Sequence, residues 1–159
     1  FKNFFQWQPD ANGRPLVRVN GGKFRNVGIE AEYGRRLSDR LKWNVSGSYS
    51  NPRQKEMNET YWKQAAPKLQ FTTGIRYESP TWEAGTSFSF VTKRLRNRDG
   101  GLNPNIALWN AYVGYHFNKD ATLRLDARNL LDRHNVITNG DYEYWGDPFT
   151  YELSYTQKF

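Results

Sequence analysis

The chain has 159 residues, a formal net charge of +7 and a mean hydropathy of −0.90. This length suits a single domain, and no apolar run approaches the ~18 residues that a membrane-spanning helix needs, so a helical membrane protein is excluded. Aromatic residues make up 16% of the chain and cysteine is absent, which excludes a disordered chain, a disulfide framework and a thiolate metal site.

Apolar and polar residues alternate with a period of two along most of the chain, which predicts β-strands. The N-terminal pieces 1–8 and 16–20 alternate poorly and are interpreted as one more rung of the same sheet. Clearer alternation follows in seven stretches, in chain order 23–36, 41–51, 67–79, 82–93, 107–118, 121–128 and 149–159. In the stretch 121–128, Leu123 and Leu125 alternate with Arg124 and Asp126. We therefore expect an all-β chain of about eight strands.

The connections between these strands alternate in length. Short turns are expected at 37–40, 79–81 and 118–121, and long loops at 52–66, 94–105 and 132–147. Antiparallel neighbours with tight turns at one end and long loops at the other form an up-and-down architecture with one functional rim.

Strand segments of about ten residues that alternate in hydrophobicity are typical of an outer-membrane β-barrel. Trp43, Tyr77, Trp82 and Phe117 lie near the short turns, where one lipid interface would fall. The alternative is a soluble barrel or sandwich whose apolar rows point inward. Aromatic-rich apolar rows and one-sided loop lengths favour the antiparallel up-and-down transmembrane β-barrel. Its lumen-facing charged residues would be Glu30, Glu32, Arg76, Glu78, Arg124, Asp126, Arg128 and Glu152.

The end of the chain resembles the C-terminal strand by which bacterial outer-membrane proteins are recognised for assembly. Phe159 is the last residue, and Tyr155, Leu153 and Tyr151 precede it at alternate positions. Gln157 departs from the pattern, since an apolar or aromatic residue is usual there. We interpret Phe159 as an assembly signal.

Two further stretches resemble the TonB-dependent outer-membrane transporters. The segment "FRNVGIEAEYGRRLSDRLKWNVSGSYSN" (24–51) is similar to the y-x-N-x-G-x-E-x-E strand pair of that family, and "LRLDARNLLDRHNV" (123–136) is similar to its N-L-F-D-K-x-Y element. Leu131 stands where Phe is more usual, and Val136 where Tyr is expected. The resemblance covers nearly the whole chain, but only the last third of such a transporter, about eight strands of a 22-stranded barrel.

The resemblance implies that residues 1–159 are the C-terminal barrel segment of an energised importer in the bacterial outer membrane. Its cargo would be a scarce nutrient such as a ferric siderophore, haem or cobalamin. Family members carry a plug domain inside the barrel and an N-terminal box that binds TonB, and both precede the region matched here. We expect the plug and the box to be absent from this sequence.

A closed barrel of these eight strands alone is the second structural hypothesis. Eight strands lying open in a bilayer would leave two edges of unpaired backbone groups, each costing several kcal/mol in hydrocarbon. Either more strands complete the wall, or the eight close on themselves around a filled interior. The second case would be a small outer-membrane protein with a structural, adhesive or enzymatic role.

The sequence contains no recognisable catalytic constellation, metal site or cofactor motif, and we expect the protein not to be an enzyme. His116 falls on a polar row and His134 in a long loop, and no spacing joins either to a ligand cluster. The lumen charges could guide a substrate or contact a plug, but a structural network of ion pairs is the favoured interpretation. The cations form no RNP-like or basic-helix pattern, so nucleic-acid binding is not expected.

The long loops are the favoured place for a ligand. They carry cations and aromatic rings at one rim, which would attract an anionic, aromatic chelate through charge and stacking. The alternative, equally weighted, is that these cations contact lipopolysaccharide phosphates and the rings anchor in lipid. The candidate ligand-binding residues are Tyr61, Trp62, Arg94, Arg96, Arg98, Tyr142, Tyr144 and Trp145.

Overall fold

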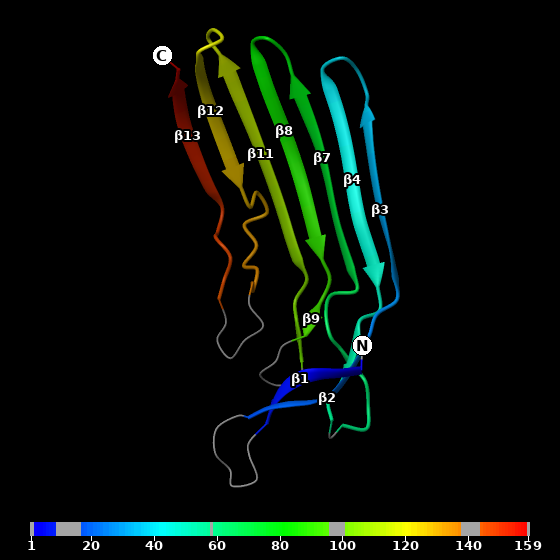
Figure 1. The fold of residues 1–159 in the computed structure, drawn as a ribbon. Coiled ribbons are helices and arrows are strands. Elements are labelled where there is room, and N and C mark those ends of the chain that lie inside the picture. Colours follow the sequence, from blue (N-terminus) through cyan, green and yellow to red (C-terminus); the bar gives the residue numbers. More distant parts are fainter. Residues whose placement is uncertain (1, 9–16, 58, 96–100, 138–143, 159) are drawn as a thin grey trace.

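The computed structural model describes all residues except 1, 9–16, 58, 96–100, 138–143 and 159 (Figure 1). Its main body is one antiparallel sheet of seven strands in the order β13-β12-β11-β8-β7-β4-β3. Within the described residues, no helix has the length and apolarity to cross a membrane. The seven strands are β3 (Gly28–Arg36), β4 (Leu41–Ser50), β7 (Leu69–Glu78), β8 (Trp82–Val91), β11 (Ile106–His116), β12 (Ala121–Arg128) and β13 (Thr150–Gln157).

The up-and-down order predicted from the sequence is confirmed. Each strand pairs antiparallel with its neighbour, and the short turns gather at one end of the sheet while the long connections gather at the other (Figure 1). Side-chain hydroxyls and amides close the turns. In the turn before β4, Ser38 Oγ accepts hydrogen bonds from the backbone N–H groups of Arg40 and Leu41. Asn118 Oδ1 does the same for Asp120 and Ala121.

The N-terminal pieces do not form an eighth rung of this sheet, so that part of the strand prediction was wrong. β1 (Lys2–Gln8) and β2 (Val17–Arg25) form a hairpin that joins β5 (Arg53–Lys55) and β6 (Lys63–Gln64) in a separate sheet on the long-loop side (Figure 1). Their poor alternation agrees with a position away from a two-faced wall. β9 (Arg94–Leu95) and β10 (Leu102–Asn103) form a third, two-stranded sheet.

A close approach at Gly28 separates β2 from β3, where the sequence indicated one continuous strand. A Cβ atom at Gly28 would lie 2.5 Å from Ser50 Cβ and 2.6 Å from the Tyr49 carbonyl oxygen. Only glycine lets the two backbones meet there. The glycine of the N-x-G-x-E motif therefore has a steric role at the point where the chain enters the main sheet.

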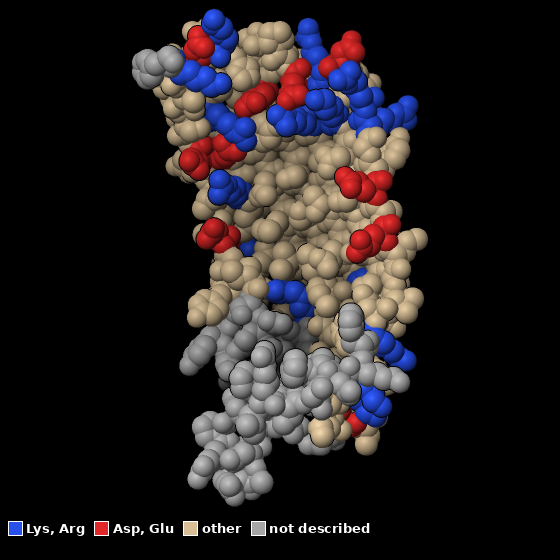
Figure 2. All heavy atoms as spheres, in the orientation of Figure 1, with Lys and Arg blue, Asp and Glu red and all other residues tan. Residues whose placement is uncertain are grey.

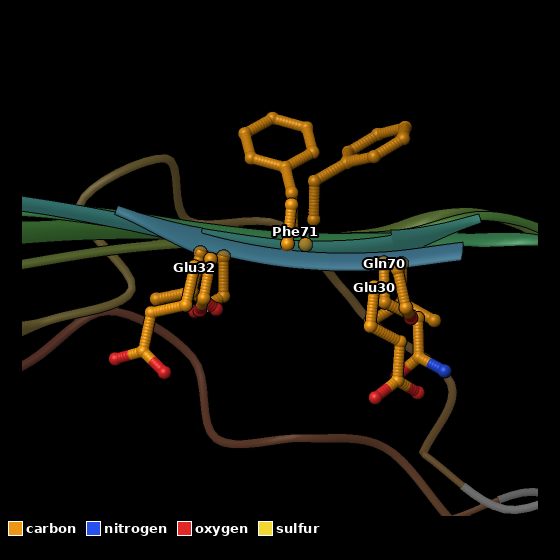
Figure 3. A pocket seen from close by; sticks show the side chains of 12 residues that line it. Glu30, Glu32, Gln70 and Phe71 are labelled. Atoms are coloured by element: carbon orange, nitrogen blue, oxygen red, sulfur yellow. The ribbon is translucent and has the colours of Figure 1, made fainter.

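The two faces of the main sheet differ in chemistry, as the alternation predicted. Figure 3 shows Phe71 on one side of the sheet and Glu30, Glu32 and Gln70 on the other. We call these the apolar face and the charged face. The register places apolar residues opposite apolar ones, so that Leu125 lies opposite both Val113 and Leu153. On the other face, Asp126 lies opposite Tyr112 and Glu152.

The apolar face has little of the molecule packed on it. Leu153 is 66% exposed and Tyr151 75%, whereas the buried hydrophobic core of the described residues consists of Ala107, Ala121 and Val136. A continuous exposed apolar surface of this extent is unlike a soluble protein and suits contact with lipid. This observation disfavours the soluble alternative, in which these rows would point inward.

Two tryptophans on the apolar face have their indole N–H groups satisfied within the sheet. Trp43 Nε1 donates to Thr73 Oγ1 at 2.9 Å, and Thr73 Oγ1 donates to the Asn44 carbonyl at 3.0 Å. Trp109 repeats the arrangement, with its Nε1 2.6 Å from Thr86 Oγ1 and that hydroxyl bonded to the carbonyl of the residue after the tryptophan. Polar groups facing hydrocarbon need such internal partners, which explains two threonines in apolar rows.

The seven-stranded sheet is open, with β3 and β13 at its edges. No pairing joins these two strands among the described residues, so the second structural hypothesis, closure by these strands alone, is not what the structure contains. Both edges carry unpaired backbone groups, and a bilayer offers no water to satisfy them.

Candidate functional site: the charged face and the long-loop rim

The predicted lumen charges share the charged face, and Arg124 on β12 makes the densest cluster there. Its guanidinium donates to both carboxylate oxygens of Asp126, at 2.7 and 2.8 Å. It also contacts Glu83 on β8 at 3.1 Å and lies 3.9 Å from the centre of the Tyr112 ring. The cluster therefore joins β12 to β8 across the intervening β11.

Two glycines make room for this cluster. Gly114 lies between Arg124 and Glu83 in the register, and a Cβ there would come within 2.8 Å of the Glu83 carboxylate. A Cβ at Gly85 would lie 2.6 Å from the ring of Tyr112. The absent side chains let the Arg124–Glu83 ion pair and the tyrosine ring lie flat against the wall.

The other charged pairs on this face are more exposed than the Arg124 cluster. Glu78 contacts Arg76 at 2.6 Å and Lys42 at 3.0 Å, and Arg128 lies 3.7 Å from Glu152. Figure 2 shows cationic and acidic side chains gathered on this face toward the short-turn end. Most of these charges thus belong to ion pairs of the kind that the structural interpretation expects.

Two hollows lie on the charged face where small polar residues leave space. The first, about 510 Å³, has Glu30, Glu32 and Gln70 at its sides (Figure 3) and serine and threonine side chains among its lining. Within the described residues, Glu30 and Glu32 form no ion pair. The second hollow, about 400 Å³, is lined in part by Arg76, Tyr112 and Arg128.

The "NLLD" element (129–132) corresponds to a tight turn at the base of the last long loop. Asn129 is 2% exposed and has a φ of 51°, which asparagine tolerates better than most residues. Its amide Nδ2 donates to the carbonyls of Arg133 and Asp147, both at 3.0 Å, and its Oδ1 accepts from the Arg133 N–H. Asp132 Oδ1 accepts from the Phe149 N–H at 2.9 Å, just before β13.

A second buried asparagine fixes the same loop to β11. Asn135 is 4% exposed, and its Oδ1 and Nδ2 bond the N–H and the carbonyl of Ala107 at 3.3 and 3.2 Å. The Asn135 carbonyl in turn accepts from the Gly146 N–H at 2.8 Å. The base of the loop is therefore held by buried side-chain amides.

Arg94, expected to meet a ligand, turns into this loop base. Its Nη1 donates to the Ile137 carbonyl at 3.0 Å and its Nη2 donates to the Val136 carbonyl. Burial lowers the pKa of the Arg94 guanidinium from its ordinary value. Arg96, Arg98, Tyr142 and the proposed assembly signal Phe159 lie outside the described residues.

The remaining candidate rings lie in two places at the long-loop end. Tyr144 and Trp145 are 63% and 54% exposed, and Trp145 packs edge-on against His134 at 6.2 Å. Tyr61 is 61% exposed with Lys63 5.7 Å from its ring centre, and Trp62 is stacked by Arg25 at 4.5 Å. Each of these last two rings already carries a cation from its own chain.

Ion pairs order the loop that carries Tyr61. Lys63 contacts Glu59 and lies 3.9 Å from Glu56. The hydrogen bond from Lys63 lowers the pKa of Glu59, and the hydrogen bond to Glu59 raises the pKa of Lys63. In this loop the exposed ring of Tyr61 therefore lies beside a cation, Lys63, that Glu59 and Glu56 partly neutralise.

Sequence reasoning missed three residues that shape this rim. Arg25 lay in a segment interpreted as wall, and only the cation–π contact with Trp62 connects it to the loops. Asn129 and Asn135 were part of the segment that resembles the transporter family, but no repeating pattern in the sequence indicates their buried polar contacts. An asparagine directly after a strand, before a turn, was the one local signal for Asn129.

Comparison with known proteins places this geometry among receptors. The family model described as TonB dependent receptor-like, beta-barrel matches residues 1–130. A search of curated protein sequences found no match.

Solved structures resemble the chain over almost all of its length. The ferric citrate transporter FecA in its unliganded form aligns with 98% of this chain and 27% of its own, with 23% identity and a TM-score of 0.76. The copper transporter OprC aligns with 99% and 27%, with 17% identity and a TM-score of 0.73. The ferric-catecholate import receptor Fiu from E. coli K12 aligns with 97% and 23%, with 17% identity and a TM-score of 0.72. The chain thus spans about a quarter of these structures, and identities this low establish the fold alone.

Proposed function

Because the chain belongs to the TonB-dependent receptor β-barrel family, we propose that it is the C-terminal wall segment of an outer-membrane transporter for a scarce nutrient. The match over residues 1–130 carries this proposal. The open sheet with a lipid-type face on one side and ion pairs on the other supports it, because such a sheet needs further strands at β3 and β13.

The proposed setting is the outer membrane of a Gram-negative bacterium. The apolar face would contact lipid, the short turns would lie on the periplasmic side and the long loops would lie outside, next to lipopolysaccharide. The charged face would line the barrel interior and contact a plug domain, and a region outside residues 1–159 would bind TonB. We propose transport without catalysis.

The chemistry of the rim favours an anionic chelate with flat rings as cargo. Exposed Tyr144 and Trp145 offer π-faces, and Arg25 and Lys63 place positive charge beside Trp62 and Tyr61. A solved relative described as a ferric-catecholate import receptor agrees with a chelate that has flat rings, and one described as a ferric citrate transporter agrees only with an anionic chelate. Haem, cobalamin and copper belong in the test as further cargo classes.

The test is uptake by cells in which the complete protein is the sole receptor. Labelled ferric citrate, ferric enterobactin, haem, cobalamin and copper are supplied separately, with and without TonB. We expect TonB-dependent accumulation of one ferric chelate. TonB-independent entry, or entry of none of the five, contradicts the proposal.

A paired substitution tests the rim. Replacing Tyr144 and Trp145 by alanine should weaken binding of the transported chelate about tenfold or more, since stacking contributes of the order of 1 kcal/mol per ring. Tyr151→Ala is the control, because Tyr151 is even more exposed than the two rim rings but lies on the apolar face of β13. Equal effects of the two changes would remove the ligand role of the rim.

A further inference from the structure

Arg94 uses its guanidinium on the backbone of a neighbouring loop. It lies in β9, just beyond the loop-side end of β8, and its Nη1 and Nη2 donate to the carbonyls of Ile137 and Val136. These carbonyls are 42 and 43 residues away in sequence. One side chain thus joins two of the three long loops.

The two carbonyls belong to a pair of antiparallel segments, 135–137 and 144–146, which we call the arm. The arm carries the exposed rings of Tyr144 and Trp145. Val136 is 7% exposed and forms a β-bridge with Trp145. The Ile137 N–H donates to the Tyr144 carbonyl at 2.9 Å, and the Gly146 N–H donates to the Asn135 carbonyl at 2.8 Å. Holding Val136 and Ile137 therefore also holds the backbone of Tyr144 and Trp145.

The arm is gripped on both sides. Asn135 bonds the backbone of Ala107 on β11 with its side-chain amide, and Arg94 holds the next two residues from β9. Removing the Asn135 side chain would leave the buried N–H and carbonyl of Ala107 without partners, which is costly. Removing the Arg94 side chain would release the part-buried Val136 carbonyl and the more exposed Ile137 carbonyl. The position of the rings is thus determined from outside their own loop.

The charge of Arg94 faces the protein. Its Nε atom is buried and has no hydrogen-bond partner among the described residues, and burial is the cause that lowers its pKa. No ion pair joins Arg94 to a carboxylate in that part of the chain. A guanidinium that presents its donors to two adjacent carbonyls acts through hydrogen-bond geometry, which an ammonium group cannot reproduce.

We propose that Arg94 is a positioning residue that orients Tyr144 and Trp145 by holding the Val136–Ile137 backbone, and that it does not contact the negative charge of the ligand. The effect on ligand binding rests on the proposed function. The grip on the loop does not, so the two can fail separately.

Hydrogen exchange of the complete, ligand-free protein in detergent tests the grip. Arg94→Lys and Arg94→Gln should each speed exchange of peptides containing Ile137 and Gly146 about tenfold, because the arm opens more often. Arg133→Lys is the control, since Arg133 is exposed in the same loop and its hydrogen bonds with Asn129 are made by its backbone. Wild-type exchange in both Arg94 variants would overturn the proposal.

Ligand binding separates positioning from ionic contact. With ferric citrate or ferric enterobactin as probe, whichever the wild type binds, both Arg94 variants should lose affinity to a similar degree, and the salt dependence of binding should stay unchanged. Rescue by Arg94→Lys together with a shallower salt dependence in Arg94→Gln would show an ionic contact and overturn the positioning role. If the wild type binds neither chelate, the proposed cargo class fails while the exchange experiment still decides the grip.

Discussion

A charge placed on the apolar face should reveal which side of the sheet meets lipid. Leu125 is the fifth residue of β12, is 41% exposed and lies between Val113 and Leu153 on that face. A strand rises ~3.3 Å per residue, and a tilt of ~40° reduces this to about 2.5 Å along the membrane normal. Four residues therefore place Leu125 about 10 Å inside an apolar band of ~25 Å, close to its midplane.

Leu125→Arg should accordingly lower the free energy of unfolding in bilayers by about 2–4 kcal/mol. Leu123→Arg, on the same strand but only ~5 Å inside the band, should cost about half as much or less, because the penalty falls toward the interface. Thr156→Arg lies on the charged face of β13, opposite Thr122, and should change the stability by less than about 0.5 kcal/mol.

The measurement is a urea titration of the complete protein in lipid vesicles. The folded fraction at each urea concentration is read from gels, in which folded and heat-denatured protein migrate differently. The order Leu125, Leu123, Thr156 in decreasing cost is the expected result. Equal tolerance of Leu125→Arg and Thr156→Arg would refute the assignment of the apolar face to lipid. A larger loss for Thr156→Arg would reverse the two faces.

Three further predictions concern the charged face and the loops. Arg124→Gln should destabilise the protein by about 1–3 kcal/mol in the same titration, because it leaves Glu83 and Asp126 without their shared cation, whereas Arg128→Gln, whose contact with Glu152 is long and exposed, should have little effect. Asn129→Ala should increase proteolysis of the loop after β12, since several buried hydrogen bonds are lost and the left-handed backbone disfavours alanine. Asn129→Gly relieves only the backbone strain, so its loop should be cleaved more slowly than that of Asn129→Ala. Equal cleavage of both variants would argue against a role of backbone strain. The pKa of Glu59 is lowered from 4.5 and that of Lys63 is raised from 10.5, so the ion pair stabilises the loop fully between these two pH values. This stabilisation is lost as the pH falls through the lowered pKa of Glu59, and again as the pH rises through the raised pKa of Lys63. Protease sensitivity of this loop should therefore rise in acid, and Glu59→Gln should remove that acid-induced change.

Much of the wall could be predicted because it obeys a local rule. Strand side chains alternate between two faces, so Leu123 and Leu125 had to lie opposite to Arg124 and Asp126 once the stretch was extended. The alternation of short turns and long loops likewise required neighbouring strands to be antiparallel. The prediction of one strand over 23–36 was wrong at Gly28. The break there is caused by a close contact with the next strand, which no periodic pattern in the sequence indicates.

The loop-side residues were harder, because their contacts join distant parts of the chain. Arg94 was predicted to bind a ligand from its place in a basic loop, and in the structure two of its N–H groups donate to carbonyls more than 40 residues away. Arg25 and Trp62 were assigned to separate elements, and the structure stacks one on the other. Residue types indicate that a cation or a ring is present, and only the fold decides what it meets.

The sequence by itself determined that the chain is all-β, that its strands have one apolar and one charged face, and that its long loops gather at one end, because all three follow from side-chain order along single strands. Tertiary structure alone decided that β1 and β2 leave the wall, that the sheet stays open at β3 and β13, and that Asn129, Asn135 and Arg94 hold the last loop. These features depend on hydrogen bonds between residues far apart in sequence, whose partners are set by how the strands are brought together in space.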